Sequence, residues 1–289
     1  MKNRSLFICL LLASSAVAAD TPRKIAFERG DNSVWVANLD GAGAKKIAAG
    51  VDPCISPDGT KLAFNTESNT RFIAVADIAT RKVAVFKNVP SDNSYGPVWA
   101  PDGRKLLFNI FIGSDWDIGL VNADGSGFRV LKKAGPNSHS YFSACWMPDG
   151  QSLYCQDIEN LYHIGLDGAV IKQWPLQKLF IKSDMNSNSR LDVSPDGRML
   201  LAEVDADEDS GRKDWDGPPP EIQVMDLATE STRKVTPIFW WEPCWITPDE
   251  FLCIGQGVKE KLPSIYRVSL DGKTRTLVIK NAMNPSVSK

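Results

Sequence analysis

Histidine is scarce in this sequence. The 289 residues include only two, His139 and His163, and the second lies in the apolar stretch LYHIGL, where a structural role is favoured. A metal centre built from several histidines cannot be assembled from two. The G-x-S-x-G element of serine hydrolases and the Gly-rich loops that hold phosphate groups are also missing. These absences remove several large classes of enzyme.

Neither sign of charge predominates, and long apolar runs are missing. Lys and Arg number 33 against 35 Asp and Glu, which gives a net charge of -2. This balance argues against nucleic acid or an anionic membrane surface as the partner. The apolar run from Leu6 to Leu12 is shorter than the ~20 residues that span a bilayer, and no later run reaches that length. We expect no transmembrane segment.

The first residues are typical of an export signal. Lys2 and Arg4 precede the apolar run, and the small residues of AVAAD offer a cleavage site near Ala19. We therefore predict a signal peptide over residues 1–19 and a mature chain over 20–289, located in the periplasm or secreted. An N-terminal anchor that is retained is the alternative.

One eleven-residue pattern recurs along the chain. CISPDGTKLAF is followed by VWAPDGRKLLF, CWMPDGQSLYC, DVSPDGRMLLA and a shortened CWITPDEFLCI. The aspartates of its Pro-Asp turn are separated by 44, 47, 47 and 53 residues and are Asp58, Asp102, Asp149, Asp196 and Asp249. Propeller blades repeat at a similar period of about 40–50 residues.

Each copy reads as four strands. An apolar strand ends at Pro-Asp-Gly, which favours a tight turn, and a second strand follows at once. A third strand with alternating apolar residues, such as IGLVNADG, ends in a signal for a hairpin into a fourth. No stretch keeps helical periodicity for three turns. The chain is predicted to be all-β.

The two ends of the chain complement each other. The mature chain begins with a second strand, IAF, and finishes with NPSVSK, which matches the residues before the Pro-Asp-Gly turn. The C-terminal strand would therefore complete the N-terminal blade. Five complete units and this shared one predict a six-bladed β-propeller of four-stranded blades, closed into a ring. A β-sandwich or an open solenoid would not explain the complementary ends.

The repeat resembles that of the TolB-type six-bladed β-propeller family, which reads roughly W-S-P-D-G-x-x-[IL]-[AY]-F. The resemblance covers nearly all of the mature chain. TolB proteins carry an α/β domain before the propeller, whereas here the first strand follows the signal peptide almost directly. The resemblance thus implies a propeller-only member, and a place in the Tol–Pal system stays open.

The starts of the six innermost strands identify residues at one mouth of the central channel. Alignment of DPCI, GPVW, SACW, RLDV, EPCW and NPSV places six first residues around the axis. We call them the mouth ring: Asp52, Gly96, Ser143, Arg190, Glu242 and Asn284.

Aromatic residues in the loops beside this ring suggest a binding face. PIFWWEP, NSYGP and NSHSYFS contribute aromatic side chains, which are enriched in binding hot spots. The alternative is that they fill wedges between blades. The predicted binding face comprises Asp52, Tyr95, His139, Tyr141, Phe142, Arg190, Phe239, Trp240, Trp241, Glu242 and Asn284.

Two sets of acidic residues are candidates for a cation. Asp205, Asp207 and Asp209 alternate in a long insertion, but they lack the spacing of an EF-hand loop. A solvated acidic loop is the alternative. Asp52 and Glu242 at the mouth are the second candidate, because TolB-like channels can hold a metal ion. We expect no other cofactor.

These features favour an exported, monomeric and non-catalytic binding protein. Its axial-channel face would bind a peptide or protein partner in the cell envelope. A carbohydrate-active enzyme on the same scaffold, either a lyase or a glycoside hydrolase, is the alternative. Lyases resembling the oligogalacturonate lyases need several histidine ligands, which this sequence does not supply.

The cysteines of two repeats are placed for disulfides. Cys145 and Cys155 flank one Pro-Asp turn, and Cys244 and Cys253 flank another. Folding each hairpin would bring its two cysteines near one another, and an exported location is oxidising. We predict the disulfides Cys145–Cys155 and Cys244–Cys253, with Cys54 free. Reduced and buried thiols are the alternative.

Overall fold

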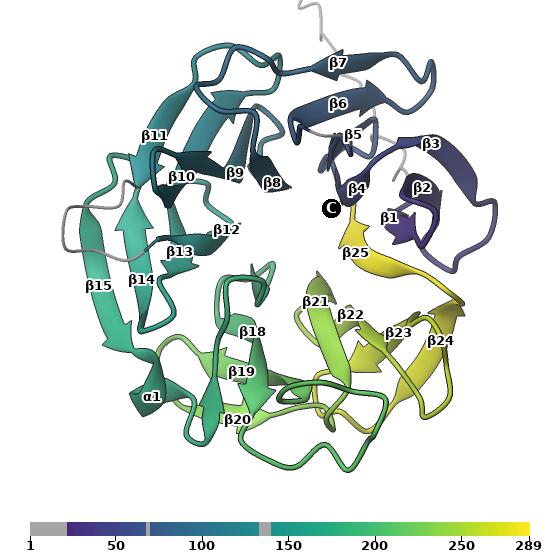
Figure 1. Ribbon diagram of the computed structural model, residues 1–289, viewed down its shortest axis with the longest axis vertical. Helices are drawn as coiled ribbons and strands as arrows, with labels where there is room; N and C mark the ends of the chain where they lie inside the picture. Colours follow the sequence, from purple (N-terminus) through teal and green to yellow (C-terminus); the bar gives the residue numbers. More distant parts are fainter. Residues whose placement is uncertain (1–21, 68–69, 133–139) are drawn as a thin grey trace, which may run out of the picture.

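The computed structural model describes residues 22–67, 70–132 and 140–289. Their strands form six sheets arranged as blades around a common axis (Figure 1). The one helix among these residues is a single turn, α1 (Leu176–Leu179). No helix in this part of the chain is long and apolar enough to cross a membrane. The predicted all-β, six-bladed propeller is confirmed, whereas the predicted signal peptide lies outside the described residues.

The first three blades are numbered along the chain and given from the axis outwards. Blade 1 consists of β25 (Met283–Val287), β1 (Lys24–Arg29), β2 (Ser33–Asn38) and β3 (Lys45–Ala49). Blade 2 consists of β4 (Val51–Ile55), β5 (Lys61–Asn65), β6 (Ile73–Asp77) and β7 (Val83–Val85). Blade 3 consists of β8 (Ser94–Trp99), β9 (Lys105–Ile112), β10 (Asp115–Asn122) and β11 (Arg129–Lys132).

The other three blades follow the same plan, with one variation. Blade 4 consists of β12 (Phe142–Trp146), β13 (Ser152–Gln156), β14 (Asn160–Gly165) and β15 (Val170–Pro175). In blade 5 the innermost position is divided between β16 (Ser183–Asp184) and β17 (Leu191–Val193), followed by β18 (Met199–Ala206), β19 (Pro220–Asp226) and β20 (Thr232–Lys234). Blade 6 consists of β21 (Trp240–Thr247), β22 (Glu250–Gly255), β23 (Ser264–Ser269) and β24 (Arg275–Ile279).

Blade 1 joins the two ends of the chain, as predicted. Its inner strand β25 runs antiparallel to β1, with Val287 opposite Ile25 and Ser286 opposite Ala26. Beyond the ladder, the amide of Ser288 donates to the carbonyl of Lys24 at 3.0 Å. Backbone hydrogen bonds between the two ends therefore close the ring, and β1 is not left with an unpaired edge.

The Pro-Asp-Gly turns have the conformation that their residues favour. In the turn of blade 2, Gly59 has a φ of 66°, a region that other residues rarely occupy. The carboxylate of Asp58 accepts hydrogen bonds from Ser56 Oγ at 2.6 Å and from the Thr60 amide at 3.0 Å. The aspartate thus satisfies the local polar groups while glycine allows the reversal.

Tryptophans of the inner strands lock neighbouring blades together. Trp99, Trp146 and Trp245 are 5–6% exposed and lie within the apolar layers between blades. Each indole Nε1 donates to a carbonyl of the preceding blade's inner strand, at 3.0, 3.2 and 3.0 Å respectively. The repeated tryptophan therefore supplies both apolar burial and a hydrogen bond between blades.

The two predicted disulfides are wrong. Cys145 lies opposite Tyr154, and Cys244 lies opposite Leu252. Because successive strand residues point to opposite faces, Cys155 and Cys253 face away from their intended partners. All five cysteines in the described part of the chain are free thiols. Cys54 was predicted to be unpaired and is so.

Candidate functional site

The inner strands of all six blades enclose a channel on the propeller axis (Figure 1). Its cavity has a volume of about 290 Å³. All six residues of the mouth ring line it, as the alignment of the inner strands predicted. Arg23 and Lys289 also line it, near the Pro-Asp-Gly turns at the other end. One repeated position of the inner strands thus forms the mouth of the channel.

A β-bulge presents most of the mouth ring to the channel. The strand register shifts between Val51 and Cys54, between Tyr95 and Val98, and at the matching places in blades 1, 4 and 6. A bulge bends the strand and redirects a side chain. Proline follows the ring residue in four blades, and proline is tolerated at bulges and on inner edge strands because it lacks an N–H.

The bulges hold ring residues in the left-handed region. Asp52, Ser143, Glu242 and Asn284 have φ values of 51°, 59°, 53° and 53°, and Gly96 has 62°. Asp and Asn tolerate this region comparatively well, whereas Ser and Glu do so less readily. Such a conformation costs about 1–3 kcal/mol for a residue other than glycine and often occurs at functional sites.

A second row of polar residues supports the ring from behind. It occupies one position of the second strand in five blades, where the pattern of the neighbours would place an apolar residue. We call it the polar row: Glu28, Asn65, Asn109, Gln156 and Glu203, each at most 6% exposed. Buried polar groups need partners, and the two glutamates of this row accept hydrogen bonds from backbone amides at bulges. Asn65 Nδ2 instead donates to the Asp52 side chain, and Asn109 Nδ2 donates to the Tyr141 carbonyl. Gln156 Nε2 donates to Ser143 Oγ and to the Asn186 carbonyl.

Carboxylates connect the inner strands of neighbouring blades. Glu28 Oε2 accepts hydrogen bonds from the Asp52 amide at 3.0 Å and from Asn284 Nδ2 at 2.9 Å. Glu203 Oε2 accepts one from the Glu242 amide at 3.0 Å. Glu242 Oε2 in turn accepts one from the Asn284 amide. These bonds join blades 5, 6, 1 and 2 along one side of the mouth.

Arg190 reaches across this side of the mouth. Its backbone amide donates to Glu203 Oε2 at 3.3 Å. Its guanidinium extends past blade 6 to blade 1, where Nη2 donates to Asn284 Oδ1 at 3.2 Å and Nη1 to the Pro285 carbonyl at 3.3 Å. Arg190 is the one cationic residue of the mouth ring, and it contacts neutral oxygen atoms there.

Burial makes the carboxyl groups of the mouth reluctant to ionise. It raises the pKa of Glu203 to about 8, and the nearby Glu242 carboxylate adds to that rise. Burial likewise raises the pKa of Glu242 to about 7, although Arg190 opposes this rise. The pKa values of Glu28 and Asp52 are also raised, mainly by burial. The mouth therefore changes its charge near neutral pH.

Asp192 adds a carboxyl group deeper in the channel. It lines the cavity, and its Oδ2 accepts a hydrogen bond from the Trp245 amide at 2.7 Å. Burial raises its pKa to about 6, while that hydrogen bond, Lys289 and Arg190 act in the opposite direction. Cys54, Cys145 and Cys244 line the same part of the channel.

The ring residues on the other side of the mouth, Gly96 and Ser143, are uncharged. Tyr95 lines the cavity, and its hydroxyl donates to the Ser187 carbonyl of blade 5 at 3.3 Å. The Ser143 hydroxyl donates to the Ser189 carbonyl. The loop of residues 186–189 therefore leans over blade 4 and narrows the mouth on that side.

The predicted binding-face residues do not all lie at this mouth. Asp52, Tyr95, Arg190, Glu242 and Asn284 line the cavity. Tyr141, Phe142 and Phe239 are 5%, 5% and 9% exposed, so they lie among packed side chains. His139 lies outside the described residues.

The two tryptophans of PIFWWEP belong to a strand, not to the predicted loop. Trp240 and Trp241 begin β21. The Trp240 ring packs on Tyr266 at 4.9 Å between ring centroids, and the Trp241 ring packs edge-to-face against Trp215 at 5.8 Å. Trp215 comes from the long insertion of residues 207–219, which therefore covers part of this aromatic cluster.

Sequence reasoning missed two aromatic residues beside the mouth. The hairpin of β9 and β10 pairs Phe111 with Trp116 directly across its two strands. The Trp116 ring also meets Tyr95 edge-to-face at 4.8 Å, and Arg71 lies over both rings at 5.9 Å. The signal was the length of this hairpin, whose two strands have eight residues each.

The predicted cation sites gain no support from the structure. Asp205 Oδ2 accepts a hydrogen bond from Asn186 Nδ2 at 2.8 Å, while Asp207 and Asp209 are exposed. Among the residues that the structure describes, no group of three or more His, Cys, Asp or Glu side chains is arranged to hold a metal ion. A cation between Asp52 and Glu242 stays a prediction.

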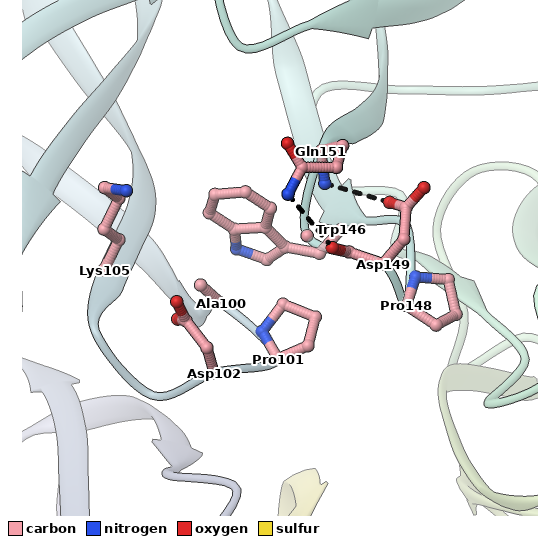
Figure 2. Close-up of a pocket in the computed structure, with 9 residues that line it drawn as sticks. Ala100, Pro101, Asp102, Lys105, Trp146, Pro148, Asp149 and Gln151 are labelled. Atoms are coloured by element: carbon pink, nitrogen blue, oxygen red, sulfur yellow. Dashed lines mark hydrogen bonds between the residues drawn. The ribbon is translucent and has the colours of Figure 1, made fainter.

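A second cavity lies at the opposite face, between the turns of blades 3 and 4. It has a volume of about 270 Å³. Figure 2 shows the Trp146 ring between Lys105 and Asp102 on one side and Gln151 and Asp149 on the other. The Asp149 carboxylate already takes part in the hydrogen bonding of its own turn, since its Oδ1 accepts a hydrogen bond from the Gln151 amide at 2.9 Å. The cleft follows from the spacing of two repeated turns.

Comparisons with known proteins agree with this architecture. Residues 23–288 match the family described as TolB beta propeller domain. A TolB homolog of Chlorobaculum tepidum is 29% identical over 117 residues, which are 38% of this chain and 26% of the relative. The match thus spans about a quarter of that relative's length.

Solved structures show the same fold at low sequence identity. TolB from Acinetobacter baumannii superposes with a TM-score of 0.72 at 17% identity, over 95% of this chain and 68% of that one. An oligogalacturonate lyase from Vibrio parahaemolyticus superposes with a TM-score of 0.53 at 18% identity, over 84% of this chain and 73% of that one. One scaffold therefore occurs in proteins of different function, and function has to be argued from the site.

Proposed function

This chain belongs to the TolB β-propeller family, and we propose that it is an exported, non-catalytic protein that binds a peptide segment of an envelope protein at the mouth of its axial channel. The observation that carries the proposal is the mouth ring itself. Five blades use a bulge to turn one residue each into a common cavity, and in four of them this residue is not glycine and is held in the strained left-handed region. Strain that is repeated around one opening is typical of a functional surface.

The dimensions of the mouth suit a narrow ligand. The cavity of about 290 Å³ has the volume of a small pocket and admits one extended chain or a few side chains. Its wall carries hydrogen-bond donors and acceptors in Ser143, Arg190 and Asn284, and an aromatic surface in Tyr95. Polar groups around an aromatic contact are typical of peptide recognition.

A carbohydrate-active enzyme is the second candidate, and one observation favours it. Glu203 and Glu242 are neighbouring carboxyl groups with pKa values of about 8 and 7, and groups tuned in this way can act as acids or bases. Each, however, uses a carboxylate oxygen to hold a backbone amide of the next inner strand. That engagement supports a structural role for both.

Obstruction of the mouth tests the proposal. A Cβ at Gly96 would meet no atom within 4 Å, so Gly96→His places an imidazole in the opening. Gly211 is a matched control, because it has the same φ of 62° and the same open surroundings but lies in the insertion. We expect Gly96→His to lower capture of the partner from envelope extract at least about tenfold, whereas Gly211→His leaves it unchanged.

Equal capture by both variants would contradict the proposal. A parallel screen of oligosaccharides for binding and cleavage addresses the enzyme. Cleavage that Glu203→Gln and Glu242→Gln abolish, without loss of folding, would favour the second candidate.

A further inference from the structure

We infer that Arg190 is the receptor for a carboxylate group of the bound segment, supplied either by a chain terminus or by an acidic side chain. The inference rests on the proposed function, since it names the chemistry that the mouth recognises. It specifies which chemical group of the ligand the cavity recognises, and neither the fold nor the comparisons supply that information.

The donors of Arg190 are only partly used. A guanidinium has five N–H donors, and two of them make the hydrogen bonds to Asn284 Oδ1 and the Pro285 carbonyl, at 3.2 and 3.3 Å. Three are left without an acceptor among the described residues. Both acceptors are neutral, and both distances are at the long end for N–H···O bonds. The guanidinium lines the cavity and is therefore reachable by a ligand in it.

The surrounding carboxyl groups are committed elsewhere. Asp52, Glu203 and Glu242 face Arg190 from β4, β18 and β21, and Asp192 and the Cys244 thiol lie nearby. No carboxylate oxygen of a described residue lies within 4.0 Å of the guanidinium nitrogens. Instead, Glu203 and Glu242 hold backbone amides, and Asp52 Oδ2 accepts from Asn65 Nδ2 at 2.9 Å.

A carboxylate would complete what the protein leaves open. A buried charge without a close counter-ion is costly, and a guanidinium binds a carboxylate through two parallel hydrogen bonds. A ligand carboxylate could engage the unused edge of Arg190 without breaking the bonds to blade 1. Since burial raises the pKa of Glu203 and Glu242, these groups repel the ligand less as the pH falls.

Arg71 is the other arginine of this face and provides a matched control. Its Nε and Nη2 already donate to Asn93 Oδ1, and it lies over the Tyr95 and Trp116 rings. Loss of Arg71 therefore removes a positive charge near the mouth without removing the receptor in the channel.

Three acetylated tetrapeptides separate the sources of the carboxylate. The first is Gly-Ser-Gly-Ala with a free C-terminal carboxylate, and the second is the same peptide as its amide. The third is Gly-Asp-Gly-Ala amide, which carries the carboxylate on a side chain. Binding is followed in protein with ¹⁵N-labelled arginine, where the Arg190 Nε–H signal is identified by its absence from the Arg190→Lys variant.

We expect at least one acidic peptide to bind about tenfold more tightly than the neutral amide, as one charged hydrogen-bonded contact implies. Arg190→Gln should abolish this preference, and Arg71→Gln should keep it. Arg190→Lys preserves the positive charge but not the paired N–H donors of the planar guanidinium, so this variant should lose most of the preference for the acidic peptides. Binding should tighten as the pH falls from about 8.5 to about 6, because Glu203 and Glu242 then become protonated.

Equal binding of the amide and both acidic peptides would overturn the inference. So would a preference that survives Arg190→Gln, or binding that weakens as the pH falls, which would instead indicate a site for a cation. The proposed function is judged separately by Gly96→His. Capture that Gly96→His prevents but Arg190→Gln leaves intact would retain the function and reject the role of Arg190.

Discussion

Glu203 accepts a hydrogen bond from the backbone amide of Glu242 at 3.0 Å, so a buried carboxyl group of blade 5 holds the inner strand of blade 6. The same oxygen accepts the amide of Arg190 at 3.3 Å. The neighbouring blades depend on similar bonds from Glu242 and Glu28. The shape of the mouth and the protonation of its carboxyl groups are therefore linked.

The linkage gives a pH dependence of stability with a definite sign. The pKa of Glu203 is about 8 in the folded protein, against an ordinary value of 4.5. A group whose pKa rises on folding stabilises the fold when protonated. Its contribution is complete below about pH 4.5 and is lost as the pH rises to about 8.

Glu203→Gln should therefore make the unfolding free energy less dependent on pH. The amide keeps an oxygen for the two backbone donors but never ionises. As the pH rises from about 5.5 to about 8.5, the unfolding free energy of the variant relative to that of the unaltered protein should increase by at least about 1 kcal/mol, measured by urea unfolding. Asp207→Asn, at an exposed carboxylate, is the control and should show no such gain. Parallel pH profiles for Glu203→Gln and the unaltered protein would contradict the argument.

The closure of blade 1 should be essential for stability. Deletion of Asn284–Lys289 removes the ladder of β25 with β1 and the hydrogen bond from the Ile55 amide to Ser286 Oγ at 3.0 Å. It also leaves Arg190 and Glu242 without their partners on blade 1. We expect a loss of several kcal/mol from a typical total of about 5–15, and a melting temperature lower by about 10 °C or more.

Deletion of Lys289 alone is the control for this truncation. Its amide makes one hydrogen bond, to the Pro57 carbonyl at 3.0 Å, so the melting temperature should fall by no more than a few degrees. Should the protein without Asn284–Lys289 melt within about two degrees of the full chain, β25 would not be needed to close the ring.

The repeat was sufficient to predict the fold and the mouth ring. Pro-Asp marks the same turn in five blades, and alignment of the inner strands before it carries Asp52 and Glu242 to equivalent places around the axis. A position that recurs in every unit of a closed ring has one location in space. The ring therefore needed no knowledge of loops or side-chain packing.

The register of the inner hairpins and the role of the buried polar residues could not be predicted from the sequence. The bulge lies between Phe142 and Cys145 and contains the ring residue Ser143, and the residues of the turn decide which residue lies opposite Cys145. The alternative registers of this hairpin differ by one residue. A shift of one residue in strand register moves every side chain of the strand to the opposite face of the sheet. The role of Glu203 was also missed, although a polar residue recurs at its place in five of the blades.

The aromatic residues divide between core and surface in a way that substitution can reveal. Trp240 packs on Tyr266, lies beneath Arg275 and contacts the cluster between blades 5 and 6. Trp240→Ala should therefore lower the unfolding free energy by about 2–4 kcal/mol, measured by urea unfolding. Trp116→Ala, at the rim of the mouth, should lower it by less than about 1 kcal/mol.

Partner capture should show the opposite order. Trp116 lies against Tyr95, which lines the channel, so Trp116→Ala should weaken capture while the protein stays folded. If Trp240→Ala left stability unchanged and weakened capture instead, the surface beside blade 6 would be the binding face.

Thiol counting tests the cysteine geometry directly. Cys145 and Cys155 belong to different apolar clusters on the two sides of blade 4, so no rotation of side chains can join them. We expect all five thiols after residue 21 to react with a chromogenic disulfide in the denatured, unreduced protein. In the folded protein, burial raises the pKa of Cys145 and Cys253 well above the usual value, so their thiolates are scarce and their reaction should be slow. A single reactive thiol after denaturation would show that two disulfides form and that the register of these hairpins is wrong.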